Sequence, residues 1–206
     1  MLREALASLV VAAGFAAFVP ASARAEVPGA RTRYQELVAE ALSEFEAARY
    51  EEALVLFEHA HAEKPSARAL RGIAKTLFEL RLYARSLHAI DAALASPLDP
   101  LTGALRDDLV ALRERTLRFV GRVVVTTEPR STQISIDGTE RTCAPDAGCV
   151  LDLGRHTLRA SAPDHESAER TLEVGSGAAV RLAIRLAPLH VPITASASRT
   201  VPIALG

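Results

Sequence analysis

The sequence is poor in several residue types, and its charges nearly balance. Among its 206 residues there is no tryptophan, aromatic residues make up 4%, and lysine occurs only at Lys64 and Lys75. The formal net charge of -1 gives no whole-chain reason to expect binding to nucleic acid or to an anionic membrane surface. Hydrophobic residues at 49% and charged residues at 24% are typical of a globular protein. Any binding site must therefore come from a local cluster of residues.

The motifs of common catalytic sites are also missing. There is no H-E-x-x-H and no glycine-rich nucleotide loop, and Gly175-Ser176-Gly177 lacks the G-x-S-x-G spacing of a nucleophile elbow. His59 and His61 stand two apart in a helical segment, so their side chains point about 200° apart and cannot share a metal ion. We expect no catalytic residue, no metal site and no cofactor, and hence a protein that is not an enzyme.

The first 25 residues have the pattern of an export signal. Arg3 precedes the apolar run 5–19, and the sequence Ala-Arg-Ala at 23–25 offers a small-x-small cleavage site. The run is shorter than the roughly 20 residues that span a bilayer, which disfavours a permanent anchor. We expect cleavage after residue 25, a linker over 26–33, and a location in the periplasm or at the cell surface. Retention of the signal segment is the alternative.

Cysteine is scarce as well, because the chain has only Cys143 and Cys149, with five residues between them. An oxidising compartment lets such a pair persist as a disulfide. Closing so short a loop is worth about 2 kcal/mol in the chain-entropy model. A zinc site is the weaker alternative, since it needs four ligands and no second Cys or His pair has matching spacing.

The spacing of apolar residues changes abruptly near residue 120. From 34 to 120 the spacing is helical, and from 121 to 188 it alternates along short segments separated by Gly and Pro. The chain is therefore predicted to be an α+β protein, with an antiparallel helical domain followed by a small all-β sandwich.

The helical half contains a repeat with a step of 33 residues. The matched positions are Ala41 with Ala74, Phe45 with Phe78, Glu46 with Glu79, Tyr50 with Tyr83, Phe57 with Ile90, and Ala60 with Ala93. This pattern, with Pro65 after the first pair of helices, resembles the tetratricopeptide repeat, which implies antiparallel helix pairs with a concave groove. The segment 101–119 reads as a capping helix with one apolar stripe, made of Leu101, Leu105, Leu109, Leu112 and Phe119.

The β half is similar to the PEGA domain, a small all-β module of bacterial envelope proteins. Pro129 to Thr132 stands at the name-giving tetrapeptide, Ile134 to Gly138 matches a strand and tight turn, and Leu153 to Leu158 matches the P-G-x-H-x-V segment. Asp137-Gly138 suits a hairpin turn in which both residues have positive φ. For His156, within the last of these segments, we expect a structural hydrogen bond.

A candidate binding surface lies on the helical half. Arg68, Arg71 and Lys75 recur at i, i+3 and i+7, so they share one stripe of a helix. By their place in the repeat, they match positions that line the tetratricopeptide groove. The corresponding positions of the first repeat are more apolar and comprise Gln35, Val38 and Leu42, with Phe45 close by.

Such a groove suits a protein or peptide partner with an apolar side chain and an acidic residue or free carboxylate. The alternative is that the cations form a solvated face, balanced by glutamates of the neighbouring repeat. These glutamates are Glu36, Glu44, Glu51, Glu52 and Glu58.

Taken together, these features predict an exported, non-enzymatic adaptor or scaffold of the bacterial cell envelope. A regulatory subunit of an envelope enzyme would differ only in its partner. The alternative is a carbohydrate- or peptidoglycan-binding protein that uses the β module. Sugar binding usually needs exposed rings, and all three tyrosines fall in the helical half. The tail 189–206 carries two Val-Pro-Ile segments, and it is either disordered, an added edge strand or a docking peptide.

Overall fold

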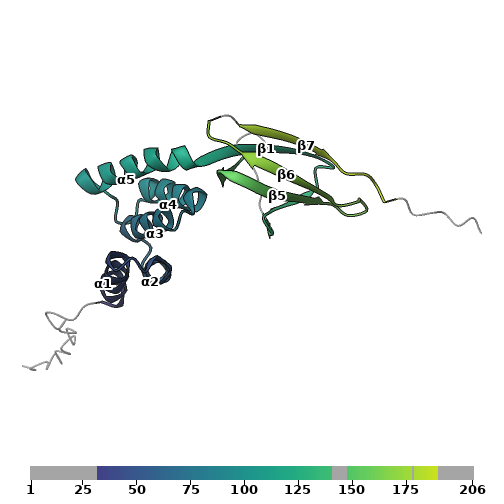
Figure 1. Cartoon of the computed structure of the whole chain (residues 1–206). Coiled ribbons are helices and arrows are strands. Elements are labelled where there is room, and N and C mark those ends of the chain that lie inside the picture. Colours follow the sequence, from purple (N-terminus) through teal and green to yellow (C-terminus); the bar gives the residue numbers. More distant parts are fainter. Residues whose placement is uncertain (1–31, 141–147, 178, 190–206) are drawn as a thin grey trace, which may run out of the picture. The chain divides into compact units, whose positions relative to one another are not determined.

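A computed structural model of the chain describes residues 32–140, 148–177 and 179–189 (Figure 1). The predicted export signal, Cys143 and residues 190–206 lie outside the described residues. The described helical elements are α1 (Arg33–Glu46), α2 (Tyr50–Glu63), α3 (Ala67–Glu79), α4 (Tyr83–Ala95), α5 (Gly103–Thr116) and the 3-10 turn η1 (Leu117–Phe119). The strands are β1 (Val120–Glu128), β2 (Gln133–Ile136), β3 (Thr139–Glu140), β4 (Cys149–Asp152), β5 (Gly154–Ser161), β6 (Ala168–Val174) and β7 (Val180–Arg185). The predicted α+β class is confirmed. None of the helices in the described part is long and apolar enough to cross a membrane.

The helices pack in pairs that repeat one another in detail. α1 packs on α2, and α3 packs on α4. In the first pair the rings of Phe45 and Tyr50 meet edge to face at 5.3 Å, and in the second those of Phe78 and Tyr83 do so at 5.4 Å. The turn of each pair contains a residue with positive φ, and Ala48 and Arg81, which fill this place, are 33 residues apart. The region is therefore a helical repeat with the predicted step.

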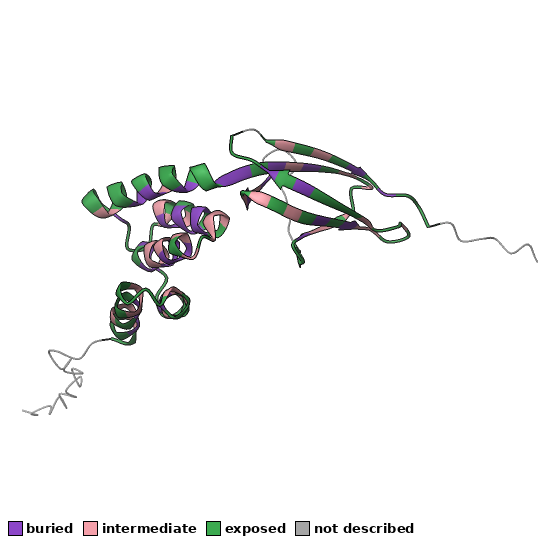
Figure 2. Ribbon diagram, viewed as in Figure 1, coloured by how far each residue is buried: buried purple, intermediate pink, exposed green. Residues whose placement is uncertain are grey.

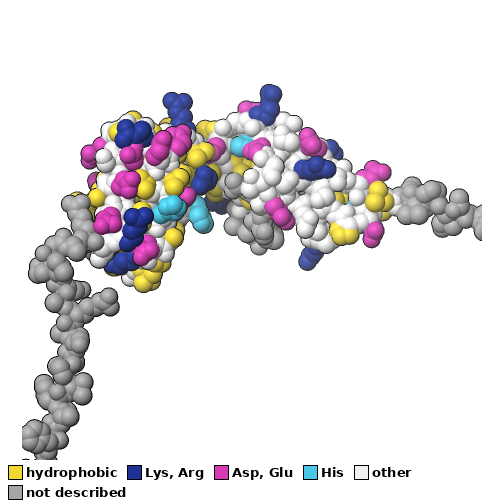
Figure 3. All heavy atoms as spheres, turned by 90° about the horizontal axis from the view of Figure 1, so that it is seen from below, with side chains coloured by type: hydrophobic (Ala, Val, Ile, Leu, Met, Phe, Trp, Pro, Cys, Tyr) yellow, Lys and Arg dark blue, Asp and Glu magenta, His cyan; other side chains and the backbone are white. Residues whose placement is uncertain are grey.

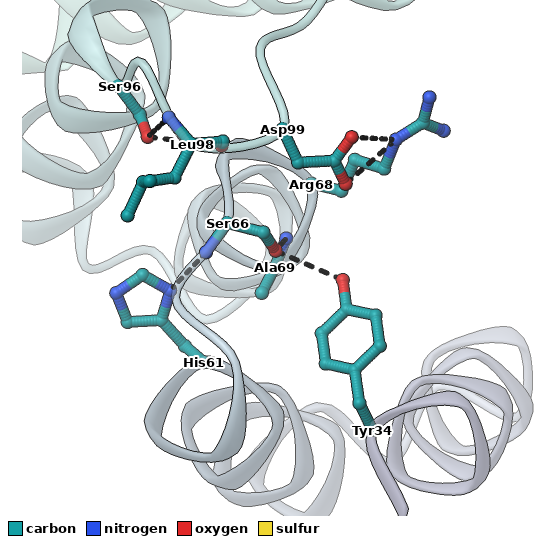
Figure 4. A network of polar contacts seen from close by, with 8 residues as sticks. All are labelled: Tyr34, His61, Ser66, Arg68, Ala69, Ser96, Leu98 and Asp99. Carbon is teal, nitrogen blue, oxygen red and sulfur yellow. Dashed lines mark hydrogen bonds and ion pairs between the residues drawn. The ribbon is translucent and has the colours of Figure 1, made fainter. Parts of the chain in front are cut away.

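Side chains at the helix starts cap the helices, and one of them also links the two repeats. The Thr32 side chain accepts from the backbone N–H of Gln35, and the Gln35 side chain accepts in return from Thr32, which forms a capping box on α1. Ser66 caps α3 by accepting from the N–H of Ala69 at 3.2 Å. The same hydroxyl lies 3.0 Å from the Tyr34 hydroxyl of α1 (Figure 4). This contact fixes the start of α3 relative to α1.

Small residues allow the helices to approach closely. Gly72 in the middle of α3 lies against Phe57 of α2, and an added Cβ would come within 2.5 Å of that ring. Glycine weakens a helix interior by about 1 kcal/mol relative to alanine, so close packing explains its presence there. Buried hydroxyls are satisfied locally, since Thr76 donates to the Gly72 carbonyl and Ser86 donates to the Ala74 carbonyl. Buried residues recur along α3 and α4 (Figure 2).

The β region consists of two sheets around one core. One sheet has the order β4-β1-β7, with β1 and β7 parallel, and the other has the order β3-β2-β5-β6. Apolar side chains of both sheets form one cluster, which includes Val123, Leu151, Leu158 and Leu172. Asp137 and Gly138 form the two-residue turn between β2 and β3, with φ of 50° and 77°, as the sequence predicts.

A short junction connects the last helix to the first strand. α5 ends at Thr116, and η1 then leads directly into β1 (Figure 1). We predicted Phe119 on the apolar stripe of the capping helix, but its side chain is 39% exposed and its ring stacks on Tyr83 at 4.5 Å. The helix spans Gly103–Thr116 and not 101–119, so Leu101 and Phe119 both lie outside it. Leu109 and Leu112 are buried on the helix, and Leu101 is buried in the segment before it.

Candidate functional site

Six of the seven residues named for the predicted groove lie around one cavity of about 230 Å³, and Gln35 is not among its lining residues. Its apolar wall comes from Val38, Leu42 and Phe45 on α1, together with Phe57 and Leu105. Its cationic wall comes from Arg68, Arg71 and Lys75 on α3. The structure thus brings together residues that are up to 37 positions apart, from Val38 to Lys75, on one concave surface. We call this cavity the apolar cavity.

A second cavity of about 300 Å³ adjoins it between α3 and α5. It shares Arg71 and Lys75 with the apolar cavity and adds Asp108, Arg115 and the apolar side chains of α5. We call it the polar cavity. Three cationic side chains and one carboxylate line it, so it favours an anionic group. Sequence reasoning missed Asp108 and Arg115, because their place depends on how α5 crosses α3, and no repeat partner of α5 indicates that crossing.

Two of the three cations on α3 are paired with aspartates. The Arg68 Nε lies 3.2 Å from the nearer carboxylate oxygen of Asp99, and both side chains are well exposed (Figure 4). The Arg71 Nη2 lies 3.3 Å from a carboxylate oxygen of Asp108, which is 67% exposed. Such exposed pairs contribute only about 0 to 1 kcal/mol.

Lys75 has a different neighbour, because its Nζ lies 5.8 Å from the centre of the Phe45 ring. Three of the five glutamates that we considered as balancing charges pair with other arginines. Glu44 pairs with Arg49, Glu58 with Arg85 and Glu36 with Arg33. Acidic and basic side chains are interspersed over the helical surface seen in Figure 3. The alternative of a solvated face is therefore still open, but with aspartates in place of the glutamates.

A larger hollow of about 700 Å³ lies on a different face of α3, beside Leu70, Ile73 and Leu77. Its rim includes Gly148 and Cys149, next to residues outside the described part of the chain. Because this rim borders residues outside the described part, we do not treat the hollow as a candidate site. Among the described residues no group of three or more His, Cys, Asp or Glu side chains could hold a metal ion.

The β region contains a polar network around His156. The Nδ1 atom lies 2.6 Å from a carboxylate oxygen of Asp137, and Nε2 lies 2.8 Å from the Asp152 carbonyl oxygen. The predicted structural hydrogen bond of His156 is thus present. Burial lowers the pKa of His156, but the hydrogen bonds to Asp137 and Asp152 and the attraction of both carboxylates raise it, and the pKa lies above its ordinary value. With acceptors at both ring nitrogens, the protonated imidazolium fits this place best.

The same network reaches the helical region. The Asp152 carboxylate accepts from the N–H of Ala84 at 2.6 Å, near the start of α4. The α4 N-cap residue, Leu82, provides no side-chain cap, so a residue 70 positions later takes that role. The predicted partner of Cys149 lies outside the described residues, and Cys149 itself is nearly buried at the start of β4. The disulfide remains a prediction.

The comparisons agree with the β architecture. Residues 120–190 match the family described as the PEGA domain, and the chain therefore contains a PEGA domain. It is preceded by a region of five described helices, of which the first four pack in two pairs. No curated protein matches the chain. The predicted resemblance to this domain is confirmed, and His156 is one of the residues on which we based it.

Proposed function

We propose that this protein is a non-enzymatic, exported adaptor of the bacterial cell envelope, and that its helical region belongs to the tetratricopeptide class. The observation that carries the proposal is the concave surface with Val38, Leu42 and Phe45 on one wall and Arg68, Arg71 and Lys75 on the other. An extended peptide with an apolar side chain beside an acidic group matches both walls. The PEGA domain would then hold the adaptor against another envelope component.

Three features support this function. The repeat-equivalent ring pairs and turns give the helix pairs the regular form of a peptide-binding array. The apolar cavity opens on exposed Leu42, whose side chain is 48% accessible. Charged and apolar groups lie on one surface, so the charged groups can orient a bound peptide while the apolar groups contribute affinity.

The test is a pull-down from a native envelope extract with residues 26–206. The triple variant Arg68→Glu/Arg71→Glu/Lys75→Glu reverses the groove charge. A matched control, Arg118→Glu/Arg122→Glu/Arg181→Glu, makes the same change in net charge at three exposed positions outside the groove. We expect one protein to be retained by the native form and by the control, and lost by the groove variant.

Other outcomes contradict the proposal in different ways. Equal retention by all three forms would mean that the groove is a solvated face. Retention of glycan alone would favour the carbohydrate-binding alternative and direct attention to the PEGA domain. Folding of each variant is checked by circular dichroism at 222 nm, because a groove variant that has lost its helices says nothing about binding.

A further inference from the structure

We propose that Asp108 is an internal competitor for the binding groove, and that a carboxylate of the ligand binds Arg71 by replacing it. This inference rests on the proposed function, and it assigns the place of the acidic group in the ligand.

The first observation is that the guanidinium group of Arg71 is incompletely satisfied. Its side chain is 21% exposed, and its Nε atom is covered and has no hydrogen-bond partner among the described residues. A covered donor without an acceptor is unfavourable, so this atom favours any ligand that brings an acceptor to it.

The second observation is the weakness of the contact that Asp108 makes. Only one carboxylate oxygen approaches Arg71, and the distance of 3.3 Å to Nη2 is long for a charge-assisted hydrogen bond. The Nε–H and one Nη2–H of arginine point in the same direction along one edge of the planar group. A carboxylate that replaces Asp108 can therefore accept from both atoms, which Asp108 does not do in this structure.

The third observation is the position of Arg71 in the groove. Arg71 and Lys75 line both the apolar and the polar cavity, so an anionic group bound between them lies at the boundary of the two. A neighbouring apolar side chain of the same peptide would then reach the wall formed by Val38, Leu42 and Phe45. The chemistry specified is an acidic side chain flanked by apolar residues.

Asp99 provides a matched comparison. It pairs with Arg68 by one nitrogen atom, as Asp108 pairs with Arg71, but Arg68 lines only the apolar cavity, and its side chain is 56% exposed. Removing the Asp99 charge should therefore leave binding of the acidic group nearly unchanged. A comparison of peptide binding by the Asp108 and Asp99 variants therefore distinguishes replacement of Asp108 at Arg71 from a general effect of a lost negative charge.

The experiment titrates residues 26–206 with the capped peptide Ac-Leu-Glu-Leu-NH2 and with its neutral counterpart Ac-Leu-Gln-Leu-NH2. Binding is followed by NMR, through the chemical shifts of the backbone amides of α1, α3 and α5 and of the side-chain Nε–H of Arg71. The Nε–H signal is assigned by its absence from the spectrum of Arg71→Lys. For the acidic peptide we expect Asp108→Asn to bind about fivefold more tightly than the native protein, and Asp99→Asn to stay within about twofold, as expected for loss of a weak exposed pair. Asp108→Ala should act in the same direction as Asp108→Asn.

The outcomes distinguish this inference from the function on which it rests. Equal binding of the acidic peptide by the native protein and both Asp108 variants would overturn the competitor role and leave the groove intact. An equal gain for the acidic and the neutral peptide would also overturn it, because carboxylate replacement requires a charge on the ligand. Absence of any shift at α1, α3 and α5 in all variants would overturn the proposed groove itself.

Discussion

The helical region and the PEGA domain bury their apolar surface with different residues. Eight buried core residues of the helical region are alanines: Ala41, Ala53, Ala60, Ala67, Ala69, Ala74, Ala89 and Ala93. In the described β region Ala160 is the one buried alanine, and the rest of the core is mainly Val, Ile and Leu. Alanine contacts hold helices close together, whereas branched side chains fill the space between two sheets. The helical core also contains larger residues such as Phe57 and Ile90, whereas Val38, Leu42 and Phe45 are not buried and line the apolar cavity.

The largest expected effect tests whether the two regions are separate folding units. Leu158 in the β core and Leu109 in the helical core are both almost fully buried, so replacement of either by alanine should cost about 2 to 5 kcal/mol in free energy of unfolding. Hydrogen exchange measured on peptides of each region should show loss of protection mainly in the region that carries the change. Val110→Ala, at a position that is 41% exposed, is the control and should have little effect. An equal loss in both regions from either variant would mean one cooperative unit.

The next effect concerns the cysteines, which occur only on the β side. If Cys143 and Cys149 are bridged, replacement of both by serine should lower the free energy of unfolding of the PEGA domain by about 2 kcal/mol. Thiol titration of protein produced in an oxidising compartment should find no reactive thiol before reduction and two after it. Two reactive thiols before reduction would disprove the bridge.

A smaller effect tests the junction between the two regions. Asp152→Ala removes the acceptor for the Ala84 N–H, and loss of a helix cap typically costs about 1 kcal/mol. Because the acceptor belongs to the PEGA domain, the expected result is faster hydrogen exchange in the first turn of α4. Asp107→Ala, a change of the same type at an exposed position on α5, should leave that turn unchanged. Unchanged exchange in the Asp152 variant would mean that the two regions do not depend on this contact.

Features set by local spacing or by the repeat were predictable from the sequence. The groove residues Val38, Leu42, Phe45, Arg68, Arg71 and Lys75 come together as expected because a helix places residues on a face by spacing alone, and the repeat fixes how the helices pair. The tight turn at Asp137-Gly138 was also readable, since few residues tolerate positive φ.

Contacts between elements that are far apart in the chain could not be predicted from the sequence. The pairing of Arg71 with Asp108 depends on the crossing of α3 and α5, for which the sequence has no internal template. The capping of α4 by Asp152 joins elements of different periodicity, and no local signal indicates it. The parallel pairing of β1 with β7 likewise needs the whole sheet order, because alternation shows which side of a strand is buried and not which strand lies next to it.

The smallest expected effect is a dependence of stability on pH, and it should be confined to the PEGA domain. The pKa of His156 is raised in the folded protein, so the imidazolium stabilises the fold at low pH. This contribution is complete below the unfolded pKa of about 6.5 and is lost as the pH rises through the higher folded value. The native protein should therefore lose stability as the pH rises above about 6.5, and His156→Gln should show a smaller decline over the same range.

His165→Gln is the control for that measurement. The Nδ1 atom of His165 faces the Pro163 carbonyl oxygen at 2.7 Å, without the carboxylate that accompanies His156. Urea unfolding of the native protein and both variants across the pH range isolates the His156 contribution as a difference between curves. If the native protein and His156→Gln have parallel curves, the protonated ring contributes nothing to stability, and the neutral tautomer with one unsatisfied acceptor must occupy this place. A difference that follows the titration of His156 would instead assign the pH sensitivity to the Asp137 turn, on the β side of the molecule.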